Sequence, residues 1–99
     1  MVYARGYSRG LGTYIIVRSQ LENGNNLYLL YAHLSTVSAS NGSTVNAGDK
    51  IGESGISGNA SQSGASPPHV HIEARTGSPG TSWGNLTRVN PSNYIPYLN

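Results

Sequence analysis

Two of the three histidines in the chain, His69 and His71, stand at alternate positions in the run SPPHVHIEAR, residues 66–75. If this run is a β-strand, side chains two residues apart point the same way, so His69, His71, Glu73 and Arg75 share one face. The apolar residues between them then fill the other face. Two imidazoles about 7 Å apart on a rigid surface can hold one metal ion, or can divide the work of ligand and proton carrier.

The composition favours short strands joined by turns. A chain of 99 residues makes one small domain with a thin core. It is 36% hydrophobic and contains 13 Gly, 5 Pro and no Phe, while seven Tyr and Trp83 carry the aromatic content. Such a composition is typical of β-structure with many turns rather than of helices. We therefore predict an all-β fold with Gly/Ser-rich loops, in a single domain over residues 1–99.

Several functional classes are disfavoured. The net charge of +2 arises from scattered basic residues, so no basic run indicates nucleic-acid binding. The absence of cysteine excludes a disulfide framework and thiolate metal ligands. No stretch resembles a transmembrane span, and the opening MVYARGYSRG lacks the apolar centre of a signal peptide.

The strands that would position the histidines can be placed approximately. Residues 13–19 and 27–34 are rich in apolar and β-branched side chains and flank an Asn-Gly turn, so we predict a hairpin with His33 at the end of its second strand. The following tract spaces Val37, Val45 and Ile51 among Gly, Ser and Asn, which suits short strands and tight turns. Residues 52–68 are interpreted as an ordered surface loop. The prolines after residue 90 exclude regular central strands there.

Five segments, in order, resemble the lysostaphin-type (LytM-like, duplicated hybrid motif) zinc endopeptidases, which cut peptidoglycan cross-bridges. They are GTYIIV, YAHLS, TVNAGDKIGESGISGNASQSG, PPHVHIEAR and VNPSNYIPYLN. In that family a tyrosine-x-histidine ends a core strand, a Gly-rich V-x-x-G-x-x-I-G hairpin follows, and a histidine-x-histidine strand closes the site. The resemblance implies a small antiparallel β-sheet groove.

The resemblance also assigns roles to residues. His71 matches the zinc ligand, while His69 and His33 match the catalytic pair that activates water and stabilises the tetrahedral intermediate. Tyr31 is the strand residue of the tyrosine-x-histidine motif. The implied cofactor is zinc and the implied partner is a peptidoglycan peptide or cross-bridge. An extracellular, periplasmic or phage-associated location is expected from the family.

One departure from the family pattern matters most. Family members take two further zinc ligands from an H-x-x-x-D motif that precedes the matched region. In this sequence no histidine occurs before His33, and the only aspartate is Asp49. The chain thus resembles the C-terminal two-thirds of such a domain, and we expect weak zinc binding and no hydrolysis by the chain alone. We also expect an unpaired strand edge near residues 2–7 or 13–18, open to self-association or to a partner chain.

Other readings of the same residues remain open. His33, His69 and His71 could together form a three-imidazole zinc site with an open water position. The chain could be a non-catalytic binding or regulatory module of the same fold, acting on other wall hydrolases. A biotinyl or lipoyl carrier, suggested by VNAGDKIGES around Lys50, ranks last.

Three features have simpler structural interpretations. Glu73 is expected to pair with Arg75 or with another charge on the surface. Trp83 is expected to pack in the core or at its rim rather than to bind a ligand. The glycines of GESGISG are interpreted as turn residues.

Overall fold

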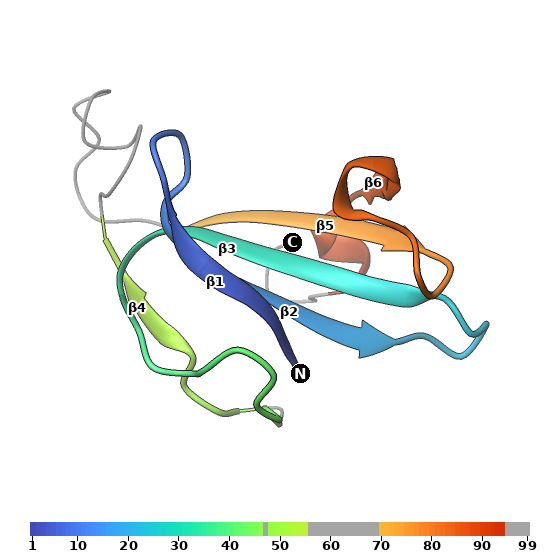
Figure 1. Cartoon of the computed structure of the whole chain (residues 1–99), viewed down its shortest axis with the longest axis horizontal. Coiled ribbons are helices and arrows are strands. Elements are labelled where there is room, and N and C mark those ends of the chain that lie inside the picture. Colours follow the sequence, from blue (N-terminus) through green and yellow to red (C-terminus); the bar gives the residue numbers. More distant parts are fainter. Residues whose placement is uncertain (47, 56–69, 95–99) are drawn as a thin grey trace.

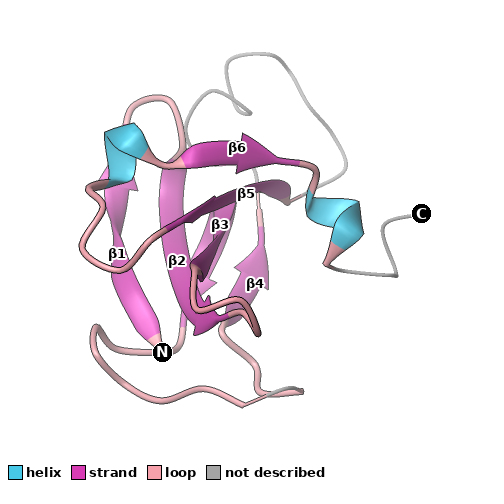
Figure 2. Ribbon diagram, turned by 90° about the vertical axis from the view of Figure 1, so that its right-hand side faces the viewer, coloured by secondary structure: helices cyan, strands magenta, loops and turns pink. Residues whose placement is uncertain are grey.

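In the part of the chain that the structure describes, six strands form one antiparallel sheet, in which the order is β1-β2-β3-β5-β6 and β4 pairs with β3 (Figure 1). The computed structural model describes residues 1–46, 48–55 and 70–94. The strands are β1 (Val2–Ser8), β2 (Gly12–Gln20), β3 (Asn26–Val37), β4 (Gly52–Ser54), β5 (His71–Gly77) and β6 (Thr87–Val89). Two single-turn 3-10 helices, η1 (Trp83–Asn85) and η2 (Pro91–Asn93), flank β6 (Figure 2). The all-β prediction is confirmed.

The β2–β3 hairpin forms where the sequence predicts it. Ile16 lies opposite Leu30, and Ser19 lies opposite Leu27. The connecting turn closes through a bond from the Leu21 amide to the Asn25 carbonyl, and Gly24 adopts a φ of 89°. That left-handed conformation is the one glycine adopts without a Cβ penalty, so the Asn-Gly pair specifies this turn.

One face of the sheet carries His71, Glu73 and Arg75, the described members of the set predicted to share a face. His71 lies opposite Ala32, Glu73 opposite Leu30, and Arg75 opposite Tyr28. Directly opposed residues of an antiparallel pair point to the same side, so we call this side the histidine face. Its apolar part is a cluster of Ile16, Tyr28, Leu30, Ala32 and Leu86.

The opposite face is covered by the segment that follows β3. Val2, Ile15 and Leu34 are buried there, and Val45 and Ile51 pack against them from outside the strands. The short strand expected around Val45 is therefore wrong, because the described residues around it pack as a loop. Ile51 directly precedes β4 rather than lying within it.

An unpaired strand edge was predicted near residues 2–7 or 13–18, and only the first of these segments lies at an edge of the sheet. β2 pairs with β1 on one side and with β3 on the other, so the prediction of an open edge at residues 13–18 is wrong. β1 ends the strand order. Its first residue exchanges backbone bonds with Gly42 and Ser43. Among the described elements, no strand pairs with the outer side of β1 beyond that point.

β6 is an edge strand of three residues that the sequence analysis did not predict. From residue 90 to residue 94, the described part of the region where prolines were expected to exclude central strands, the structure has the helix η2 and no strand. Within the ranges that the structure describes, no helix has the length and apolar character needed to cross a membrane.

Candidate functional site

The imidazoles of His33 and His71 come together at one end of the sheet. Their ring centroids lie 6.1 Å apart with planes at 60°. His71 is exposed at the first position of β5, and His33 is half-buried near the end of β3. Two of the three imidazoles predicted to face a common groove are therefore neighbours in the structure, and the catalytic and metal-binding roles assigned to them stay predictions. His69 lies outside the described residues, so its place in the site stays a prediction.

A β-bulge in β3 positions His33. Thr13 pairs with Leu34 and Ile15 pairs with Tyr31, so two residues of β3, Ala32 and His33, face a single residue of β2. His33 adopts a φ of 60°, the one positive φ outside glycine in the described chain. Bulges redirect side chains, and left-handed backbone at a non-glycine residue stores strain that is common at functional sites.

The turn between β1 and β2 holds this strained backbone. The His33 amide donates to the carbonyl of Leu11 at 2.8 Å. Leu11 is itself fixed by a bond of 3.1 Å from its amide to the Ser8 hydroxyl. Figure 1 shows this turn at the end of the sheet where β5 begins. Leu11 is thus a positioning residue that the sequence analysis missed, because no local pattern links it to His33.

Two glycines of the GESGISG run allow β4 to approach β3 closely. A Cβ on Gly52 would collide with the Thr36 carbonyl oxygen, and one on Gly55 would lie 2.7 Å from the Ser35 nitrogen. For Gly52 and Gly55 the turn interpretation is therefore wrong, because what they provide is room for a neighbouring backbone. This contact braces β3 immediately after His33.

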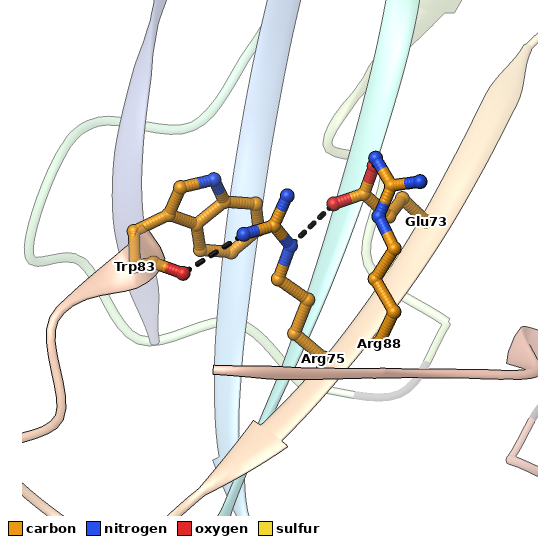
Figure 3. A network of polar contacts seen from close by, with 4 residues as sticks. All are labelled: Glu73, Arg75, Trp83 and Arg88. Atoms are coloured by element: carbon orange, nitrogen blue, oxygen red, sulfur yellow. Dashed lines mark hydrogen bonds and ion pairs between the residues drawn. The ribbon is translucent and has the colours of Figure 1, made fainter. Parts of the chain in front are cut away.

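Glu73 joins two arginines beside the site, as Figure 3 shows. Its carboxylate accepts from Arg75 Nε at 2.6 Å and from Arg88 Nη2 at 2.7 Å. Arg75 also donates to the Trp83 carbonyl at 2.8 Å and stacks 4.2 Å from the Trp83 ring centroid. Trp83 meets Tyr28 edge-on. The predicted Glu73–Arg75 pair and the packing role of Trp83 are confirmed, whereas Arg88 was not foreseen.

Tyr31 and Asp49 lie away from the two imidazoles. Tyr31 belongs to the opposite face of the sheet, where burial raises the pKa of its phenol. With Asp49 it lines a cavity of about 240 Å³. The Asp49 carboxylate accepts from the Asn46 amide at 2.8 Å and so closes a turn. Lys50 pairs with Glu53 at the surface, 3.8 Å away.

The donors in the described residues do not by themselves fit a catalytic zinc ion. Such a site takes three protein ligands and leaves one position for water. Across residues 1–46, 48–55 and 70–94, no group of three or more His, Cys, Asp or Glu side chains is placed to hold a metal ion. His33 and His71 supply two imidazoles, so any complete site needs further donors.

Comparisons with known proteins identify the family and agree with the fold. Residues 1–91 match the family model of Peptidase family M23. A solved structure, a variant of the catalytic domain of the prophage-encoded M23 protein EnpA from Enterococcus faecalis, is 33% identical and superposes with a TM-score of 0.69. The match covers 95% of this chain and 62% of that chain.

The antiparallel sheet and the family match together define the class as a lysostaphin-type metallopeptidase fold. The chain belongs to peptidase family M23. Members of this family are generally zinc-dependent and act on peptidoglycan.

Proposed function

We propose that this chain supplies the histidine part of a peptidoglycan endopeptidase site. His71 is its zinc ligand, and His33 and His69 handle protons during peptide-bond hydrolysis. The observation that carries the proposal is the 6.1 Å approach of His33 and His71 from two strands of an M23-type sheet. We infer that these 99 residues hold an incomplete metal site, because they contain no H-x-x-x-D motif.

Residues of this chain would take separate roles in the reaction. The bulge aims the His33 ring at the start of β5, where His71 projects from the same end of the sheet. An imidazole there can take a proton from an attacking water or donate a hydrogen bond to the oxyanion that develops on the scissile carbonyl. Zinc in a completed ligand set would supply Lewis-acid activation of water and carbonyl.

A segment with an H-x-x-x-D motif would complete the site, on the same polypeptide or on another. The outer side of β1 is the natural place for a strand from it, because β1 ends the strand order. The turn after β1 bonds to His33 through Leu11, so a strand added there would reach the histidines. Until it is covered, this edge favours self-association or capture of a partner strand.

The test compares the chain with a fusion that carries a family-type H-x-x-x-D segment at its N-terminus. Both are incubated with purified cell wall and zinc, and released peptides are quantified. We expect cleavage only by the fusion, and its loss on His69→Ala or His71→Ala. Robust zinc-dependent cleavage by the unfused chain would overturn the proposal of an incomplete site, and an inactive but folded fusion would overturn the enzymatic proposal.

A non-catalytic binding or regulatory module is the second candidate, favoured by the missing H-x-x-x-D motif. In that case the chain would bind purified cell wall or a wall hydrolase without metal, and His71→Ala would not weaken the binding. Either function places the protein at the cell wall, whether extracellular, periplasmic or phage-associated. Cell fractionation tests this location.

A further inference from the structure

Arg88 is the one guanidinium of the Glu73 network that stays open to solvent. Its side chain is 71% exposed, whereas the Arg75 and Glu73 side chains are 16% and 11% exposed. Arg75 donates hydrogen bonds to Glu73 and to the Trp83 carbonyl. Among the described residues the polar partner of Arg88 is Glu73 alone. Most of the five N–H donors of Arg88 therefore face solvent.

The network carries an uncompensated positive charge. Two guanidinium groups share one carboxylate, and each Glu73 oxygen already accepts from one of them. Of the other carboxylates in the described chain, Glu53 pairs with Lys50, Asp49 caps a turn, and Glu22 lies exposed in the turn between β2 and β3, with no ion pair to Arg88. The surplus charge at Arg88 is thus available to an anion from outside the chain.

Arg88 lies on the same face of the sheet as His71. In the sheet Arg88 lies opposite Arg75, on the histidine face, and its side chain reaches back to Glu73. Glu73 follows His71 by two residues on the same face, a separation of about 7 Å along a strand. An extended peptide advances about 3.3–3.6 Å per residue, so the same distance spans two substrate residues.

The side chain is also held in place before any ligand arrives. The 2.7 Å bond to Glu73 fixes one Nη atom, and Glu73 is itself held by Arg75. A guanidinium offers paired N–H groups that match the two oxygens of a carboxylate. Because Glu73 already holds the Arg88 guanidinium, less conformational entropy is lost when a carboxylate binds to it.

We propose that Arg88, held by Glu73, binds a free carboxylate of the peptide substrate about two residues from the bond that is cut. This inference rests on the proposed function, since it assumes a peptide extended along β5 from the histidines. Peptides with a free carboxylate at that spacing would be preferred over their amidated counterparts.

The test uses two synthetic wall-type peptides that are identical except for a C-terminal carboxylate or carboxamide. Binding to the unfused chain is measured by NMR titration or calorimetry. We expect the carboxylate peptide to bind about tenfold more tightly, as one charge-assisted pair allows. Arg88→Gln should abolish this preference and Arg88→Lys should keep part of it. Lys50→Gln, at an exposed and paired cation elsewhere, is the matched control and should change nothing.

The active fusion provides the second readout. Arg88→Gln should raise KM for the carboxylate peptide with little change in kcat, and should leave the amidated peptide unaffected. Thermal unfolding of each variant shows that the fold is intact. Equal affinity for both peptides, a preference that survives Arg88→Gln, or equal competition by inorganic phosphate would overturn the inference.

The two proposals fail separately. A fusion that cleaves both peptides without preference contradicts the carboxylate subsite alone. A carboxylate preference in the unfused chain, together with an inactive fusion, contradicts the enzymatic function and leaves the Arg88 site standing as a binding site.

Discussion

His33 of β3 lies 6.1 Å from His71 of β5, measured between ring centroids, and it does so through a backbone conformation that few non-glycine residues adopt. β3 pairs with β5 up to Ala32 and, beyond the bulge, with β4 from Leu34 onward. The meeting of the two rings is therefore a property of the bulge and not only of the strand register.

Replacing His33 tests the strain at the bulge. A φ of 60° costs a residue with a Cβ about 1–2 kcal/mol, which glycine avoids at the expense of greater freedom in the unfolded chain. We expect His33→Gly to be more stable than His33→Ala by about 0.5–1 kcal/mol in denaturant unfolding. His33→Asn should fall between them, since asparagine tolerates this region. A His33→Ala variant as stable as His33→Gly would contradict the assignment of strain.

The hairpin and the shared face of His71, Glu73 and Arg75 could be predicted because they follow from local patterns. An Asn-Gly turn specifies the hairpin, and alternation along a strand decides which side chains share a face. These features need no knowledge of the rest of the fold.

The bulge, the Leu11 contact and the Glu73–Arg88 pair could not be predicted from such patterns. Each depends on residues that become neighbours only when the sheet is assembled in one register. The open edge was misjudged at residues 13–18 for the same reason, because the alternation of a strand does not say how many partners it has. The loop around Val45 was misjudged because an apolar residue can cover a sheet without joining it.

Gly52→Ala tests how β4 braces the strand that carries His33. The added Cβ would meet the Thr36 carbonyl oxygen, which belongs to backbone and cannot easily move. We expect a loss of about 1–3 kcal/mol in the free energy of unfolding. Gly84→Ala is the matched control, since a Cβ there meets no atom within 4 Å, and it should be close to neutral. Equal effects of the two changes would show that β4 does not pack on β3 as described.

Alkaline pH tests the burial of Tyr31. Burial disfavours the phenolate, so the pKa of Tyr31 is raised in the folded chain. The folded state then binds this proton more tightly than the unfolded state. Its contribution to stability is fully present below the unfolded pKa of about 10 and is lost as the pH rises through the folded pKa. Unfolding followed from pH 8 to 12 should show a steeper loss for the parent chain than for Tyr31→Phe.

Tyr7→Phe is the control for the loss of a hydroxyl, because Tyr7 is 68% exposed. The profile of Tyr31→Phe is compared with the profile of this variant, so that the loss of a hydroxyl is common to both. A Tyr31→Phe profile that runs parallel to that of the parent chain would show that the phenol is more hydrated than its place beside the cavity implies.

Zinc content tests which ligand set the histidines belong to. In the unfused chain His71 is the one residue matched to a family ligand, and metal affinity rises with the number of ligands held in place. We expect substoichiometric zinc after dialysis, measured by elemental analysis. The fusion with an H-x-x-x-D segment should hold one zinc per chain, and His71→Ala should release it. His33→Ala in the fusion should keep the metal while abolishing hydrolysis, because His33 is assigned to proton transfer. One tight zinc in the unfused chain, lost on His33→Ala, would instead support the site of three imidazoles formed by His33, His69 and His71.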